Sequence, residues 1–181
     1  VLADDVVKHP FQSSIARGRV RSIRYDFDTT GFTIVDYHDV PATNAADLIT
    51  QDQPFLVEQE VRHMAEPIVL LAHEDREKLL AANVVIEYDE EEPLFDPEKS
   101  DTVFKEIDIL KGDVAAGLAG ADVIVEGTYR TGHQEHVYIE PNAVIAVPEA
   151  NGGVAIHGSV QCPFYVIKAL RCLLGSAHPN V

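Results

Sequence analysis

Short segments with a strand-like pattern open the chain. Residues 14–25 alternate apolar and polar positions, and residues 32–40 do the same after a turn at 28–31. A period of two predicts strands with one face toward a core, so the chain begins with a β meander. The segment that follows, residues 41–50, predicts a short helix with Thr43 or Asn44 as its N-cap.

A strand-helix-strand unit over residues 67–89 carries the clearest pattern in the first half. The apolar run PIVLLA predicts a buried strand, HEDREKLLAA predicts a helix, and VVIEY predicts a second strand. Glu74 and Asp75 fall in the first helical turn and Lys78 lies further on, as the helix dipole favours. Leu79 and Leu80 give this helix an apolar side.

Residues 89–101 break the alternation with seven acidic residues and two prolines. The prolines interrupt regular structure and the charges favour solvent, so this segment predicts a linker or domain boundary. Calcium binding is the less favoured alternative, because the prolines disrupt the evenly spaced acidic ligands of a Ca²⁺ loop.

The second half predicts further strands and two helices. Residues 112–121 predict a short helix capped by Asp113, and residues 122–130 and 135–148 predict strands. The turn 149–153 joins the latter to a strand at 154–160, which is typical of a hairpin. Residues 163–174 predict the most regular helix, with Pro163 in its first turn and Gly175 just after its end. The fold class predicted is α+β.

Composition and charge exclude several classes of protein. Of 181 residues, 46% are hydrophobic and 24% charged, which is typical of a folded globular chain. A net charge of −16, from 30 acidic and 14 basic residues, repels phosphate and excludes nucleic acid as a partner. The basic residues gather at four alternating positions, and they form either a positive strip or, as we expect, a solvated strand face paired with acids elsewhere. These positions are Arg17, Arg19, Arg21 and Arg24.

Neither end of the chain has the pattern of a membrane anchor or a secretion signal. No stretch approaches the ~20 apolar residues of a membrane span, so we expect no membrane partner and a cytoplasmic location. The chain begins at Val1, and its single methionine is Met64, which suggests trimming or a longer parent. Cys162 and Cys172 are ten positions apart, about 15 Å on a helix, so we expect reduced thiols rather than a disulfide or metal site.

The densest group of polar side chains in an apolar pattern lies at residues 132–141, GHQEHVYIEP. An extended backbone would place Gln134, His136, Tyr138 and Glu140 on one face and His133 on the other. That alternation argues against a metal site made by His133, His136 and Glu140, because Zn²⁺ needs three or four convergent ligands. No nucleophile elbow, phosphate-binding glycine loop or zinc-protease motif is present.

Two spaced motifs in the second half resemble the molybdenum hydroxylases, the xanthine dehydrogenase and aldehyde oxidase family. One is a Q-x-H-x-x-x-E-P pattern after a tyrosine, and the other is an S-x-Q-x-P pattern before a helix ending in Leu-Gly. The matching residues are Tyr129, Gln134, His136, Glu140, Pro141, Ser159, Gln161 and Pro163. Upstream segments, including ARGRVRSI, AEPIVLLAHEDREKLLAANVVIEYDEEEP and KGDVAAGLAGADVIVEG, resemble the same family in the same order, so nearly the whole chain is covered.

The resemblance implies a domain organisation. It implies an α/β hammerhead domain over residues 1–95, an acidic linker over 96–110 and an incomplete, β-rich start of the molybdopterin cofactor-binding domain over 111–181. In the family a glycine-rich loop and a catalytic glutamate lie further along the polypeptide, beyond the region that this sequence matches. We therefore expect an N-terminal fragment that lacks most of the active site and is inactive alone.

The resemblance also implies a function for the parent protein. Family members hydroxylate an N-heterocycle of the xanthine or purine type, or an aldehyde, with water as the oxygen source, at a molybdenum-molybdopterin centre. Gln134 matches the glutamine whose amide bonds to an oxygen ligand of the molybdenum, and Gln161 is a second cofactor-binding candidate. No residue here is expected to be catalytic or to ligate the metal, and no cofactor is expected on the fragment alone. Cys162 is interpreted as a helix-start residue rather than a nucleophile, because no base lies nearby in sequence.

The implied partners are the remainder of the molybdenum subunit, iron-sulfur and FAD domains or subunits, and a small-molecule substrate, in a homo-oligomeric holoenzyme. The alternative function is a non-catalytic, acidic α/β module that binds a protein partner. Whether the parent sequence continues into a glycine-rich loop separates the two hypotheses.

Overall fold

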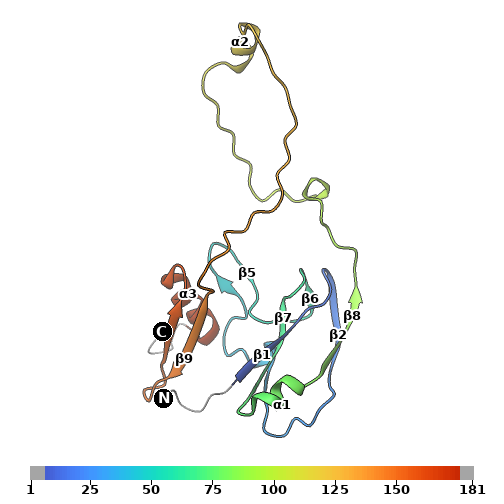
Figure 1. Cartoon of the computed structure of the whole chain (residues 1–181), viewed down its shortest axis with the longest axis vertical. Helices are drawn as coiled ribbons and strands as arrows, with labels where there is room; N and C mark the ends of the chain where they lie inside the picture. The colour runs from blue at the N-terminus through green and yellow to red at the C-terminus, as the bar shows by residue number, and fades with distance from the viewer. Residues whose placement is uncertain (1–6, 176–181) are drawn as a thin grey trace. The chain divides into compact units, whose positions relative to one another are not determined.

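The computed structural model of the protein describes residues 7–175, which form two compact units. One unit combines the chain up to Pro93 with the chain from Asn142 onward, and the other is Leu94–Pro141. Figure 1 traces the strands and helices of both. The predicted mixture of helices and strands is confirmed, whereas the predicted domain boundaries at residues 95 and 110 stay a prediction.

The first sheet of the larger unit is antiparallel in the order β1-β7-β3. Its central strand β7, Pro67–His73, confirms the buried strand predicted from PIVLLA. β1, Val7–Gln12, and β3, Thr33–Val35, pair on either side, with Phe11 opposite Val69 and Ile34 opposite Leu71. Because β7 has a neighbour on both edges, its apolar run lies at the centre of this sheet.

A second antiparallel sheet has the order β6-β2-β8. β2, Gly18–Tyr25, and β8, Val84–Glu90, confirm two predicted strands, and β6, Glu60–Val61, adds a short edge. Gly18 has a φ of 153°, and a Cβ there would lie 2.4 Å from the carbonyl oxygen of Asp89. Glycine is therefore required where β2 starts, because any side chain would collide with β8.

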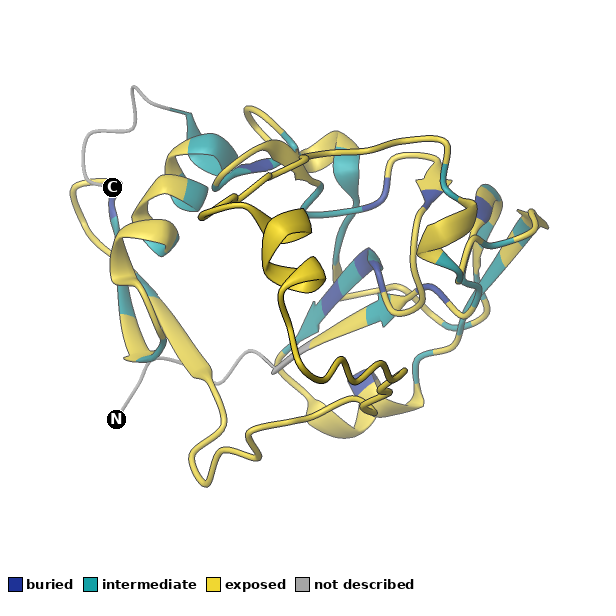
Figure 2. Ribbon diagram, turned by 90° about the horizontal axis from the view of Figure 1, so that it is seen from above, coloured by how far each residue is buried: buried dark blue, intermediate teal, exposed yellow. Residues whose placement is uncertain are grey.

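The core of the larger unit lies where the two sheets and helix α1, Arg76–Ala81, meet. Partly buried residues of both sheets pack against one buried cluster, so these two sheets form two layers around a common core. Figure 2 places the buried residues in this unit, whereas the ribbon of 94–141 is almost entirely exposed. The buried cluster consists of Val57, Val61, Ile68, Val69, Leu71 and Leu79.

Asp75 begins helix α1 as its N-cap. Its Oδ1 accepts hydrogen bonds from the backbone N–H groups of Glu77 at 2.8 Å and Lys78 at 3.2 Å. These two hydrogen bonds hold the pKa of the Asp75 carboxyl below its ordinary value of 3.8. The bond from the Lys78 N–H has the larger effect, and that from the Glu77 N–H follows. The charged cap satisfies two N–H groups that have no partner within the helix.

Asp75→Asn is therefore expected to destabilise the protein at neutral pH and to matter less in acid. A carboxyl whose pKa is lowered by folding contributes stability above its unfolded pKa, and that contribution is lost as the pH falls through the lowered value. Urea unfolding of both proteins at pH 7 and at about pH 3 measures the change. An equal difference in unfolding free energy at the two pH values would contradict the role of the charge.

The arginines of β2 and its preceding turn face acidic residues at the end of β8. Arg17 Nε lies 3.2 Å from Glu91 Oε2, and Arg21 bonds to Glu87 at 3.2 Å and to Asp89 at 3.4 Å. A hydrogen bond from Ser22 and the guanidinium of Arg21 lower the pKa of Glu87. The expectation of a solvated face paired with acids is confirmed; Arg19 and Arg24 pair with Glu91 and Asp26.

The helix predicted over residues 41–50 is wrong. The segment instead contains β4, Ala46–Asp47, which pairs with β5, Gln51–Gln53, after a 3-10 turn at Tyr37–Asp39 (η1). Asn44 explains the difference, because its side chain donates to the carbonyl of Leu56 at 2.7 Å and accepts from the Leu56 N–H at 3.1 Å. A side chain that bonds distant backbone in this way favours a loop over a helix.

A hairpin and a helix complete the larger unit. β9, Ala143–Pro148, and β10, Val154–Ser159, pair in antiparallel register, as the sequence predicted, and Gly152 adopts a φ of 84° in the turn. Helix α3, Pro163–Leu174, confirms the predicted bounds, with Pro163 in its first turn and Gly175 at its end. The two cysteines are both free, as expected.

The smaller unit, Leu94–Pro141, has little regular structure. It contains a 3-10 turn η2, Pro97–Lys99, and the predicted helix α2, Val114–Ala119, capped by Asp113. The strands predicted over 122–130 and over 135–141 are wrong, since this segment pairs with no strand in the described part of the chain. A strand needs a hydrogen-bonded neighbour, and apolar alternation alone does not provide one.

Candidate functional site

Gln134 lies in an irregular, exposed segment of the smaller unit. Without a strand, the prediction that Gln134, His136, Tyr138 and Glu140 share one strand face does not hold. Val137 has a left-handed backbone with φ of 52°, which interrupts any extended alternation. The rings of His136 and Tyr138 nevertheless lie near each other, with centroids 6.1 Å apart.

Gln161 lies between the hairpin and helix α3. β10 ends at Ser159 and α3 begins at Pro163, so Gln161 occupies a connection of three residues. Cys162 follows it with a left-handed φ of 51° and makes no side-chain hydrogen bond at the helix start. The Tyr165 N–H donates to the Cys162 carbonyl at 2.8 Å, which closes the first turn. Gln161 is thereby held on a sharp turn and is exposed.

Both glutamines offer a neutral amide to a ligand. Each side chain is exposed, and neither forms a hydrogen bond within residues 7–175. A carboxamide supplies two N–H donors and an acceptor oxygen without adding charge, which suits hydrogen bonding to polar atoms of a cofactor. The two residues belong to different compact units, so that their convergence on one ligand stays a prediction.

No side-chain group capable of binding a metal ion is present among the described residues. Within 7–175, three or more histidine, cysteine, aspartate or glutamate side chains nowhere converge as a metal ion would require. His133, His136 and Glu140 therefore do not assemble into a site.

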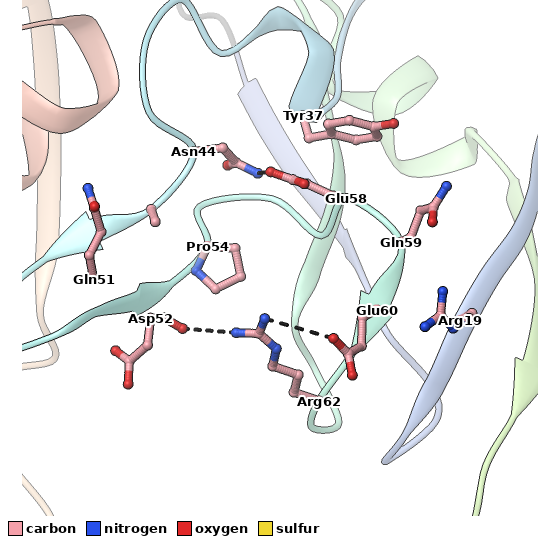
Figure 3. Close-up of a pocket in the computed structure, with 11 residues that line it drawn as sticks. Arg19, Tyr37, Asn44, Gln51, Asp52, Pro54, Glu58, Gln59, Glu60 and Arg62 are labelled. Atoms are coloured by element: carbon pink, nitrogen blue, oxygen red, sulfur yellow. Dashed lines mark hydrogen bonds and ion pairs between the residues drawn. The ribbon is translucent and has the colours of Figure 1, made fainter.

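Sequence reasoning missed a cavity of about 460 Å³ in the larger unit. Figure 3 shows Arg62 between Asp52 and Glu60: its guanidinium donates to the Asp52 carbonyl at 3.1 Å and lies 3.9 Å from the Glu60 carboxylate. Arg62 and Glu60 thus pair with each other within the lining of the cavity. Its other polar residues come from separate segments that share no sequence motif, namely Arg19, Tyr37, Asn44, Gln51, Glu58 and Gln59.

Comparison with known proteins assigns the family. Residues 95–181 match the molybdopterin cofactor-binding domain. The chain is 31% identical over 145 residues to the nicotinate dehydrogenase large molybdopterin subunit of Eubacterium barkeri, covering 73% of this chain and 34% of that protein. The chain belongs to the xanthine dehydrogenase and aldehyde oxidase family of molybdenum hydroxylases. A probable xanthine dehydrogenase subunit of Bacillus subtilis is 33% identical over 141 residues, which are 71% of this chain and 19% of that protein.

A solved molybdenum hydroxylase has the same fold. The aldehyde oxidoreductase of Desulfovibrio gigas matches 96% of this chain with a TM-score of 0.73 at 20% identity, and this chain covers 22% of it. The chain thus spans about a third or less of the molybdenum hydroxylases it matches. Gln134 and Gln161 both lie within the matched cofactor-binding domain, which confirms the family resemblance drawn from their motifs; their individual roles stay predictions.

Proposed function

We propose that this chain is part of a molybdenum hydroxylase that oxidises an N-heterocycle, of the xanthine or purine type, or an aldehyde, with water as the oxygen source. The observation that carries the proposal is the match of residues 95–181 to the molybdopterin cofactor-binding domain. Relatives named xanthine dehydrogenase, nicotinate dehydrogenase and indole-3-acetaldehyde oxidase support the two substrate classes. Because the chain spans a minor part of these relatives, the activity belongs to a larger protein.

The proposed organisation follows the family. Residues 1–95 form the α/β hammerhead domain, residues 96–110 the acidic linker, and residues 111–181 the start of the cofactor-binding domain. The two-layer packing of both antiparallel sheets around one core, and the fold likeness over 96% of the chain, support this assignment.

The cofactor of the larger protein is molybdenum-molybdopterin, which when bound supplies the redox chemistry of hydroxylation. Gln134 would donate its amide N–H to the bound cofactor, and Gln161 would make a second polar contact to it. Their exposure and their lack of hydrogen bonds within residues 7–175 support these roles, since each amide is available to a ligand. A neutral donor orients and polarises an oxygen without displacing a metal ligand.

The proposed partners are the remainder of the molybdenum subunit and the iron-sulfur and FAD domains or subunits, in an oligomeric holoenzyme. Large apolar side chains of the smaller unit support a covering partner, because isolated domains seldom expose so many together. Phe104 is 97% exposed, Phe95 is 81% exposed and Tyr129 is 86% exposed. Within residues 7–175 no helix is long and apolar enough to cross a membrane, and a cytoplasmic location stays a prediction.

Metal analysis of two purified proteins tests the proposal. The complete molybdenum-containing protein is expected to carry stoichiometric molybdenum and to reduce a dye with a purine, nicotinate or an aldehyde. The 181-residue chain alone is expected to do neither, because two amides cannot anchor a pterin whose other contacts are missing. A complete protein without molybdenum would contradict the proposed function, and stoichiometric molybdenum on the isolated chain would contradict the expected division of the site.

A further inference from the structure

Helix α3 is fastened by an ion pair and two hydrogen bonds to the segment 43–48, which lies more than a hundred residues earlier in the chain. Lys168 Nζ lies 3.3 Å from Asp47 Oδ2 and donates to the Leu48 carbonyl at 3.0 Å. One turn further on, the Thr43 N–H donates to the Cys172 carbonyl at 2.9 Å. All these residues belong to the larger unit, so this fastening is internal to one compact body.

The same helix determines where Gln161 lies. The connection from β10 to α3 is three residues long, and a chain of that length reaches at most about 10 Å when fully extended. β10 is fixed by six residue pairs with β9, and Cys162 turns the backbone sharply through its left-handed conformation. Movement of α3 against the hairpin would therefore be transmitted to Gln161, because a connection of three residues can absorb little of it.

We propose that Lys168 is a positioning residue for Gln161, acting through helix α3. This inference rests on the proposed function, in which Gln161 contacts the cofactor. Lys168 suits the role because its ammonium carries three donors and satisfies a carboxylate and a backbone carbonyl together. β4, to which Asp47 belongs, has only two residues, so the fastening depends on these polar contacts more than on an extended ladder.

Variants at position 168 in the complete molybdenum-containing protein test the inference. Lys168→Met keeps the aliphatic stem and removes the charge and donors, whereas Lys168→Arg keeps a cation that can bond to the same acceptors. Asp47→Asn weakens the fastening from the other side. Lys78→Met is the matched control, because it removes the same charge from the exposed surface of helix α1.

Hydrogen exchange and steady-state kinetics give independent readouts. The Thr43 amide bonds to the helix itself, so its exchange is expected to accelerate in Lys168→Met and Asp47→Asn but not in Lys168→Arg or Lys78→Met. Turnover by the first two variants is expected to fall roughly three- to ten-fold with KM unchanged, since displacement of a positioned group by about 1 Å can cost as much as 10²-fold. Substantial recovery of turnover in Lys168→Arg is also expected.

Three results would overturn the inference, and they are distinct from failure of the proposed function. Unchanged Thr43 exchange in Lys168→Met would show that Lys168 does not hold the helix. Faster exchange with wild-type turnover would show that the helix does not position the reaction, and equal loss of turnover in Lys78→Met would show a general charge effect. An unsubstituted protein that lacks molybdenum would instead overturn the proposed function, and this inference with it.

Discussion

Gln134→Ala in the complete, molybdenum-replete protein is expected to lower the turnover rate by ~10²–10³, which corresponds to about 2.7–4 kcal/mol of transition-state stabilisation. The proposed role explains the size of this loss, because a preorganised amide donor acts where negative charge grows on an oxygen shielded from water. Stability should change little, since the side chain is exposed and forms no hydrogen bond within residues 7–175. Steady-state turnover, normalised to molybdenum content, measures the effect.

Two further variants sharpen this test. Gln134→Glu keeps the size of the side chain but replaces the donor by a carboxylate, which repels an oxygen carrying negative charge unless it is protonated. His133→Ala is the control: it changes the neighbouring exposed residue, which lies outside the Q-x-H-x-x-x-E-P motif, and it should be far milder. Wild-type turnover in Gln134→Ala would make the cofactor role of Gln134 wrong.

Leu79→Ala is expected to produce the largest loss of stability among the changes considered, about 2–5 kcal/mol in the free energy of unfolding. Leu79 is 0% exposed on helix α1 and belongs to the core cluster with Ile68 and Leu71 of β7. Truncation of the Leu79 side chain removes apolar contacts and leaves a cavity. The neighbouring side chains can fill this cavity only in part, because the two sheets hold them in place. Urea unfolding followed by circular dichroism measures the change.

The adjacent residue provides a matched control. Leu80 lies on the same helix, is 56% exposed and has the same chemistry and helix propensity. Leu80→Ala is therefore expected to stay within about 0.5 kcal/mol of the unsubstituted protein. Comparable losses for Leu79→Ala and Leu80→Ala would mean that helix α1 does not pack as described.

Sequence patterns predicted those elements whose local signals agree with their final surroundings. The apolar run at residues 67–73 is typical of a central strand whatever its neighbours are. Pro163 and Gly175 mark the two ends of helix α3. The prediction failed over 41–50, where Asn44 bonds to the backbone of Leu56. Twelve residues separate these partners, so no local pattern could reveal the contact.

The strands predicted over 122–141 failed for a different reason. Val123, Val125 and Ile139 lie in the apolar stretches that predicted these strands, but each is exposed and no neighbouring strand pairs with them in residues 7–175. An alternating pattern of apolar and polar residues predicts that one face of a strand is apolar, but it does not show which element covers that face.

Only part of the candidate site could be predicted from the sequence. The spacing around Gln134 and Gln161 identified the family because those motifs are contiguous in the chain. The cavity beside Arg62 was missed because its lining comes from five separate segments that only the fold brings together. Contact between Lys168 and Asp47 likewise joins segments 121 positions apart, for which no sequence signal exists.

The fastening of α3 to residues 43–48 also constrains the order in which the chain can fold on the ribosome. Strands β1, β2, β7 and β8 and helix α1 are complete once residue 90 has emerged, so the core around Leu79 can form early. The Leu48 carbonyl, in contrast, can accept its hydrogen bond only after Lys168 has been synthesised, 120 residues later. At about 5–20 residues per second this interval is roughly 6–24 s, during which residues 43–48 are without their helical partner. In the nascent protein the residues of this core cluster are all present early, whereas the surface segment 43–48 gains its contacts with α3 only late in translation.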